Sequence, residues 1–262
     1  MPTEQDPPVT AKQAARELLE NNSAGERVGS RDIRHLKSAL TDQARQGDVD
    51  AQNLLGAIEL EIEQKPKSAR QWFEMSAAKG DPAGQRSLGH LYANGLGVKA
   101  DVAKAVELFR EASAGGDPFA MYNLAAANIR AKGAYCTFDE TLSLLESAAE
   151  GGVVESAAKL GDLLAGVGRN AEAIDWYVKA ASRGHTGAMD VAACWFRDGT
   201  AGQSDPVQAV RWFLAMLNSG NGDGVHEAIQ VAKSMNPEQI REAARLAGRV
   251  GDGEAIIATI SR

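Results

Sequence analysis

The sequence contains little of several features that mark particular protein classes. Only Cys136 and Cys194 of its 262 residues are cysteines, and two distant cysteines form neither a disulfide framework nor a zinc-binding pattern. No stretch approaches the ~20 apolar residues of a membrane-spanning helix. No basic segment followed by an apolar run opens the chain, so no signal peptide is expected. We therefore expect a cytoplasmic protein without a membrane role.

Basic residues are also in the minority. The chain has 28 Lys and Arg against 35 Asp and Glu, a formal net charge of −7, whereas a nucleic-acid partner favours a basic stripe. The densest basic segment, Arg27 to Lys37, is interrupted by Asp32. We therefore expect no nucleic-acid partner.

Recognisable catalytic motifs are missing as well. No H-E-x-x-H, phosphate-loop or G-x-S-x-G pattern occurs, and the four histidines are far apart. Gly95-Leu96-Gly97 follows a helical pattern, not a strand, so a dinucleotide loop is not expected. Neither cysteine has a histidine at a spacing typical of an activated nucleophile. We predict no enzyme activity, no catalytic residue, no cofactor and no metal.

What the chain does contain is a regular series of glycines. Gly47, Gly80, Gly116, Gly152, Gly184 and Gly220 follow one another at 33, 36, 36, 32 and 36 residues. Eight residues before the last five stand Trp72, Leu108, Leu144, Trp176 and Trp212, and an apolar or aromatic residue follows each. Self-similarity at this period is typical of stacked helical repeats. The three tryptophans are expected to be core residues.

Each repeated position has a physical role. A small residue, such as Gly56 or Gly89, lies nine residues after each turn glycine and lets the first helix of a repeat approach the second. The turn glycine suits a left-handed backbone. The Asp that follows three of these glycines can cap the next helix, and Pro82 and Pro118 fit its first position.

The repeat pattern sets the expected boundaries. We predict a disordered tail over residues 1–10, a helical cap over 11–46, five repeats over 47–224, and a divergent repeat with capping helices over 225–262. Helices are expected over 11–21 and 31–46. A further helix is expected from Asn236 to about Arg249, where Asn-Pro-Glu-Gln is a strong helix start, and a short one over 254–260.

The repeat resembles the Sel1-like family, a relative of the tetratricopeptide repeats. Residues 85–116 contain L-G-H-L-Y-A-N-G-L-G-V-K-A-D-V-A-K-A-V-E-L-F-R-E-A-S-A-G-G, which matches the family pattern nearly position for position. The third repeat departs from it, with Leu144 in place of the aromatic and no G-x-G-V loop. The resemblance implies an all-α, right-handed α-solenoid that acts as a non-catalytic scaffold or adaptor for other proteins. Family members linked to β-lactam binding are cysteine-rich, which this chain is not.

We predict that a protein or peptide partner binds the concave groove lined by the first helix of each repeat. The candidate residues are Asn53, Arg86, His90, Asn94, Tyr122, Arg130, Asp162, Asp190 and Arg197. Two alternatives remain: an immunity-type protein that neutralises a cognate effector, and a hydrolase of cell-wall-like or β-lactam substrates. The sequence does not identify the partner, the pathway or the oligomeric state. It also leaves open whether the protein activates or inhibits its partner and which surface is the main binding surface.

Overall fold

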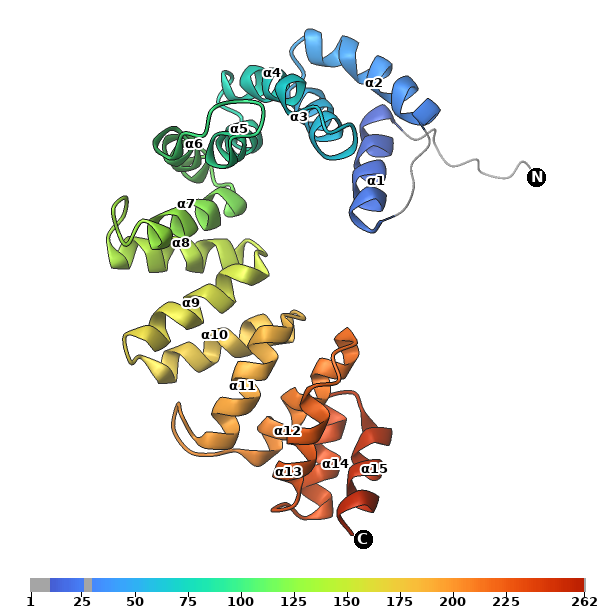
Figure 1. The fold of residues 1–262 in the computed structure, drawn as a ribbon, viewed down its shortest axis with the longest axis vertical. Helices are drawn as coiled ribbons and strands as arrows, with labels where there is room; N and C mark the ends of the chain where they lie inside the picture. The colour runs from blue at the N-terminus through green and yellow to red at the C-terminus, as the bar shows by residue number, and fades with distance from the viewer. Residues whose placement is uncertain (1–9, 26–29, 262) are drawn as a thin grey trace, which may run out of the picture. The chain divides into compact units, whose positions relative to one another are not determined.

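A computed structural model describes residues 10–25 and 30–261 of the chain. Every regular element in these ranges is a helix (Figure 1), which confirms the all-α prediction. The chain divides into two compact units, Met1–Thr137 and Phe138–Arg262, called unit 1 and unit 2 below. Of the tail expected over 1–10, residues 1–9 lie outside the described ranges.

Unit 1 is a series of short helices joined by tight turns. Consecutive helices from α3 to α7 lie against one another (Figure 1), so that they form stacked helical hairpins. The π-helical turn η1 was not expected from the sequence. The elements are α1 (Ala11–Ser23), α2 (Ser30–Arg45), α3 (Val49–Ala57), η1 (Ile58–Ile62), α4 (Pro66–Ala77), α5 (Pro82–Asn94), α6 (Val102–Ala114) and α7 (Pro118–Arg130).

Unit 2 continues the helical pattern and ends in a small bundle, in which α12 contacts α11, α13 and α14. The expected long helix from Asn236 stops at Leu246, because Gly248 adopts a left-handed φ of 69°. The last helix begins at residue 250, earlier than expected. The elements are α8 (Phe138–Glu150), α9 (Val154–Gly166), α10 (Asn170–Ser182), α11 (Thr186–Asp198), α12 (Pro206–Ala215), η2 (Met216–Ser219), α13 (Gly224–Ala232), α14 (Pro237–Leu246) and α15 (Val250–Ile260).

The small residue on the first helix of a repeat lies against the aromatic residue of the second helix. A Cβ atom added at Gly56 would lie 2.4 Å from the Phe73 ring. At Gly89 and Gly161 it would lie 2.8 Å from the ring of the paired residue. The rings concerned are Phe73, Phe109 and Tyr177, all buried. The predicted role of the small residue is therefore confirmed at these three sites.

The predicted turn and cap chemistry is also confirmed. All six turn glycines have φ between 74° and 99°, where a side chain is strained. Asp48, Asp81 and Asp117 each accept a hydrogen bond from the backbone N–H three residues on, and so cap α3, α5 and α7. Asn236 and Gln239 form the expected capping box of α14. Local sequence signals thus fix where these helices begin.

The tryptophans are only partly the core residues that the repeat pattern predicted. Trp212 is buried, with 3% of its surface exposed. Trp72 and Trp176 are half-buried, and Lys179 Nζ lies 3.6 Å from the centroid of the Trp176 ring. The fully packed position is the next residue along: Phe73, Phe109, Leu145, Tyr177 and Phe213 are 0–5% exposed. That residue faces its own hairpin, whereas Trp72 packs at the edge of the preceding cluster of α1–α3.

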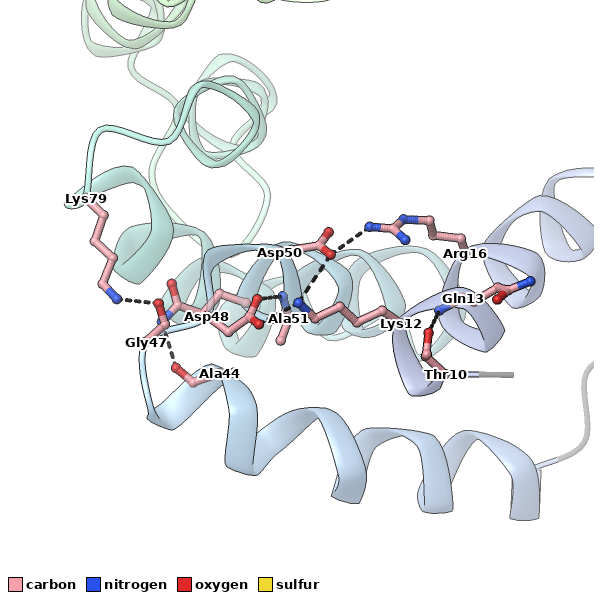
Figure 2. Close-up of polar contacts among 11 residues, drawn as sticks. Thr10, Lys12, Gln13, Arg16, Ala44, Gly47, Asp48, Asp50, Ala51 and Lys79 are labelled. Atoms are coloured by element: carbon pink, nitrogen blue, oxygen red, sulfur yellow. Dashed lines mark hydrogen bonds and ion pairs between the residues drawn. The ribbon is translucent and has the colours of Figure 1, made fainter. Parts of the chain in front are cut away.

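The first helices of unit 1 are joined by charge as well as by apolar contacts. Leu18 of α1, Leu40 of α2 and Leu55 of α3 share one buried cluster. Lys12 of α1 forms ion pairs with Asp48 and Asp50, as Figure 2 shows. The Lys12 ammonium donates a hydrogen bond to the Asp48 carboxylate and lowers its pKa. The N-cap of α3 is therefore also the point at which α1 is attached.

Candidate functional site

The nine residues predicted to line a binding groove lie in both units. Unit 1 holds Asn53, Arg86, His90, Asn94, Tyr122 and Arg130, and unit 2 holds Asp162, Asp190 and Arg197. Within unit 1 they come from α3, α5 and α7, which are the first helices of successive hairpins. We call the unit 1 surface formed by Arg86, His90, Asn94, Phe119, Tyr122 and Arg130 the α5–α7 face.

Two of the predicted residues bind the cap of the next repeat. Asn53 Nδ2 donates to Asp81 Oδ2 over 2.7 Å, and Ser76 Oγ donates to Asn53 Oδ1 over 2.7 Å. Arg86, at the equivalent place one repeat later, pairs with Asp117 through an N–O distance of 3.4 Å. The Asp117 side chain is only 10% exposed. Asn53 and Arg86 therefore connect adjacent hairpins before any partner is present.

An exposed aromatic residue stands beside Arg86. The Arg86 guanidinium lies 5.2 Å from the centroid of the Phe119 ring, and Phe119 is 51% exposed although it is a large apolar residue. Tyr122 follows one helical turn later on α7, so both side chains project from neighbouring positions. Its hydroxyl makes no hydrogen bond within the described residues. Arg, Tyr and other aromatic side chains dominate the energy of protein interfaces.

The middle of the α5–α7 face carries a histidine in a mixed electrostatic environment. Loss of hydration lowers the pKa of His90, the positive charge of Arg86 lowers it further, and Glu61 opposes both effects. Partial burial raises the pKa of Glu61. Asn94 Nδ2 donates to the His90 carbonyl oxygen over 2.9 Å. His90 is therefore biased toward its neutral form, which can donate and accept hydrogen bonds.

The far end of the face contains a cavity of about 280 Å³ between α5, α6 and α7. Its wall includes Val102, Val106 and Phe109, and Asn94 and Arg130 also line it. The structure thus brings two predicted site residues, Asn94 and Arg130, to one hollow. Arg130 is exposed and makes no ion pair or hydrogen bond within the described ranges.

The predicted residues of unit 2 are bound differently. Arg197 pairs with Asp198 and with Glu227, each at an N–O distance of 2.7 Å. Asp162 accepts a hydrogen bond from the Tyr177 hydroxyl over 3.0 Å and pairs with Lys159. Asp190 is exposed. The only predicted arginine of this unit is thus neutralised by two carboxylates.

The cysteines are free thiols in different settings. Cys136 is buried and Cys194 is half-buried. Burial raises the pKa of the Cys194 thiol, and Asp190 adds to the effect, so its thiolate fraction at neutral pH is small. In the described part of the chain, no three His, Cys, Asp or Glu side chains gather as metal ligands would. None of the helices described is both long and apolar enough to cross a membrane.

Sequence reasoning missed Phe119 and Asn128. The residues equivalent to Phe119 in other repeats are Asp50, Ala83, Glu155 and Gly187, so an aromatic at a polar or small position was the available signal. Asn128 is 3% exposed, and its side chain bonds the backbone of Tyr135 and Cys136. It holds the loop after α7, and the repeat pattern contains no signal for that contact.

Several solved structures are similar to this chain, and one of them is similar enough to support the fold. A crystal structure of a Sel1 repeat protein from Oxalobacter formigenes superimposes with a TM-score of 0.67 at 21% identity, covering 92% of this chain and 99% of that one. A putative Sel1 repeat protein from Klebsiella pneumoniae subsp. pneumoniae gives 0.47 at 21% identity, covering 75% and 99%. Immunity protein Pa5087 from Pseudomonas aeruginosa gives 0.45 at 17% identity, covering 81% of each chain. The first likeness supports the fold alone.

Stacked helical hairpins with a glycine at each turn define an α-solenoid repeat protein of the tetratricopeptide-like class. The Sel1 repeat model matches residues 49–81, 82–117, 154–185 and 187–221, and the chain therefore belongs to the Sel1 repeat family. The third predicted repeat, residues 117–152, is not among the matched segments, and it is the one that lacks the aromatic and the G-x-G-V loop. Sel1 repeats generally mediate protein–protein interactions, and the fold is typically a non-catalytic scaffold.

Proposed function

We propose that this protein is an adaptor that binds a partner protein through the α5–α7 face of unit 1. The observation that carries the proposal is the exposed Phe119 ring, which is held beneath Arg86 and lies one turn from Tyr122. Aromatic and arginine side chains contribute most to binding when a partner removes them from water. The unpaired Arg130 and the neutral-biased His90 add polar groups to the same face.

Unit 1 is favoured over unit 2 because its Arg130 remains available to a partner. Arg130 has no acidic partner in the described residues, whereas Arg197 is held by two carboxylates. A binding residue that must first break two ion pairs loses part of the energy gained from a partner. Asn53 and Arg86 contribute indirectly, since their bonds to Asp81 and Asp117 fix the spacing of α3, α5 and α7.

The test is affinity capture from native lysate with the full chain and two matched variants. Phe119→Ala combined with Tyr122→Ala removes the exposed Phe119 ring and the half-buried Tyr122 ring beside it without touching an N-cap. We expect at least a tenfold loss of captured partner, since an interface hot spot contributes about 2 kcal/mol or more. Phe138→Ala removes a similarly exposed aromatic from α8 (42% exposed) and should leave capture unchanged. Equal capture by the double variant, with helix content retained, would contradict the proposal.

A second candidate function is neutralisation of a cognate effector, and the charge of unit 2 favours it. Unit 2 has 17 acidic residues against 11 basic ones, whereas unit 1 has 18 against 17. An acidic surface attracts a basic partner and speeds association at low salt. Co-expression with the products of adjacent genes tests this function. It requires a toxic, basic partner whose binding weakens with salt, and a neutral or acidic partner would count against it.

A further inference from the structure

The cavity between α5, α6 and α7 combines an apolar wall with an unpaired cation. Val102 is 49% exposed at its mouth, and Val106, Phe109 and Ala127 form much of the interior. Its volume of about 280 Å³ lies below the range of about 300–1,000 Å³ that holds small molecules and cofactors. A hollow of this size suits one apolar side chain of a partner.

The Arg130 side chain makes no hydrogen bond to the carbonyl oxygens at the end of its own helix, α7. The carbonyl oxygens of Ala127, Asn128 and Ile129, at the end of α7, accept from the backbone N–H groups of Ala131, Gly133 and Lys132. No acidic residue lines the cavity, and Asp101, which directly precedes the lining residue Val102, caps α6 through the Lys104 N–H. The guanidinium therefore has five donors and no anion among the described residues.

Asn94 supplies an acceptor at the same cavity. Its Nδ2 group is occupied by the His90 carbonyl oxygen, and its Oδ1 atom has no donor within the described ranges. The loop that follows α7 is also held in place, because Asn128 binds the backbone of residues 135 and 136 and Arg110 donates to the Tyr135 carbonyl oxygen over 2.9 Å. The Asn94 amide and the loop after α7 are thus arranged before a ligand arrives.

We propose that this cavity binds the C-terminal residue of a partner chain, with an apolar side chain in the hollow and the α-carboxylate on Arg130. The inference rests on the proposed function and specifies the partner's chemistry. In a terminal residue the carboxylate and the side chain share one Cα atom, which matches a cation and an apolar wall around a single small cavity. Guanidinium and carboxylate form a bidentate, charge-assisted pair. Asn94 Oδ1 accepts the N–H of the terminal residue.

The experiment uses the full chain and three acetylated tetrapeptides as probes. The first ends in leucine with a free carboxylate, the second is the same peptide as an amide, and the third is an amide with aspartate before the leucine. Methyl NMR shifts of Val102, Val106 and Ala127 report binding at the cavity. We expect the free acid to bind at least about tenfold more tightly than either amide.

Two variants test whether Arg130 is the group that distinguishes the free acid from the amide. Arg130→Gln should reduce the ratio between acid and amide to about one, whereas Lys67→Gln, which removes an exposed charge from α4 outside the cavity, should leave the ratio intact. The proposal is overturned if the plain amide binds as well as the acid, if the shifts arise elsewhere, or if Arg130→Gln keeps the ratio. It is also overturned if the aspartate peptide equals the acid, which would point to an internal acidic residue. If these peptides fail while capture still requires Phe119 and Tyr122, the adaptor function stands and only the terminal-residue inference falls.

Discussion

Unit 1 and unit 2 use the same repeat but connect successive hairpins in different ways. In unit 1 each of the three first helices, α3, α5 and α7, begins with an aspartate cap, and a side chain from the preceding hairpin binds that aspartate. In unit 2, the N-cap residue Val153 makes no side-chain bond to α9, the His185 ring caps α11, and Asp223 makes no cap bond to α13. Unit 2 joins α11 to α13 through the ion pair between Arg197 and Glu227, and α12 contributes six buried residues.

The difference shows that polar coupling between hairpins can use an N-cap aspartate, as in unit 1, or bypass it, as in unit 2. In unit 1 the exposed Phe119 ring lies beside Arg86, which is paired with the N-cap aspartate Asp117. In unit 2, Trp212 and Phe213 of α12 are buried, at 3% and 0% exposure, whereas Phe138 of α8 is 42% exposed. Unit 1 thus holds an arginine beside an exposed aromatic ring, which is the pair of side chains that the proposed interface uses.

The largest expected effect is in the core of unit 2. Phe213→Ala removes a fully buried ring from α12, and such truncations cost about 3–5 kcal/mol. Chemical denaturation of the full chain, followed by NMR signals from each unit, should show unit 2 lost at lower denaturant and unit 1 affected less. If Phe213→Ala destabilises both units equally, the separate treatment of the two cores is wrong.

A glycine substitution distinguishes close packing from helix propensity. Gly89→Ala places a methyl group 2.8 Å from the Phe109 ring, and overpacking of this kind costs about 1–3 kcal/mol. Gly251→Ala in α15 meets nothing within 4 Å and should stabilise by up to about 1 kcal/mol, because alanine favours helix. Thermal unfolding of the two variants gives the comparison. Stabilisation by Gly89→Ala would show that the hairpin is not tightly closed there.

The aspartate caps provide the direct test of polar coupling. Asp81→Ala removes the cap of α5 and leaves Asn53 Nδ2 without its partner, so we expect a loss of about 1–2 kcal/mol. Asp81→Asn keeps an acceptor and should recover most of this loss. Asp223→Ala is the matched control in unit 2, where no cap bond exists, and its free energy of unfolding should stay within about 0.5 kcal/mol of the parent chain.

A smaller gain in stability is expected from a glycine substitution at Gln64, which lies just after η1 in unit 1. Gln64 has a left-handed φ of 54°, which is unfavourable for a residue with a side chain. Gln64→Gly should stabilise by about 0.5–1 kcal/mol, since relief of strain outweighs the added freedom of the unfolded chain. Gln46→Gly, at a turn residue without positive φ, should destabilise instead. A loss of stability with both variants in thermal unfolding would contradict the strain argument.

The smallest expected effect is a change in the pKa of His90 on the α5–α7 face. The pKa of His90 lies below 6.5 because of lost hydration and the charge of Arg86. Since the folded pKa is the lower one, unit 1 should lose stability as the pH falls through 6.5. Arg86→Gln should raise the pKa of His90 and Glu61→Gln should lower it, both measured by NMR titration. No change in either variant would show that these three groups do not share one face.

Much of the fold follows from local signals in the sequence. Turn glycines, the caps at Asp48, Asp81 and Asp117, and the Asn236 capping box each act within a few residues, so spacing alone predicts them. The end of the α14 helix was less predictable. Gly248 was read within a helix, although glycine at that place adopts a left-handed φ.

The candidate site was less predictable because it depends on contacts between repeats. The helical period placed Asn94 and Arg130 on one face, and the structure brings both to one cavity. The same period could not show that Asn53 and Arg86 bind the next cap, or that Trp72 lies at a cluster edge while Phe73 is buried. Those outcomes depend on the neighbouring hairpin. The concave-groove assignment and the domain boundaries stay predictions.

The central claim is that a partner binds unit 1 over α5 and α7. Hydrogen exchange of the full chain, measured with and without a captured partner, tests it most directly. The account predicts slowed exchange in residues 86–130, which include the ends of α5 and α7 around the cavity, and little change in residues 138–261. Protection confined to residues 138–261 would contradict it.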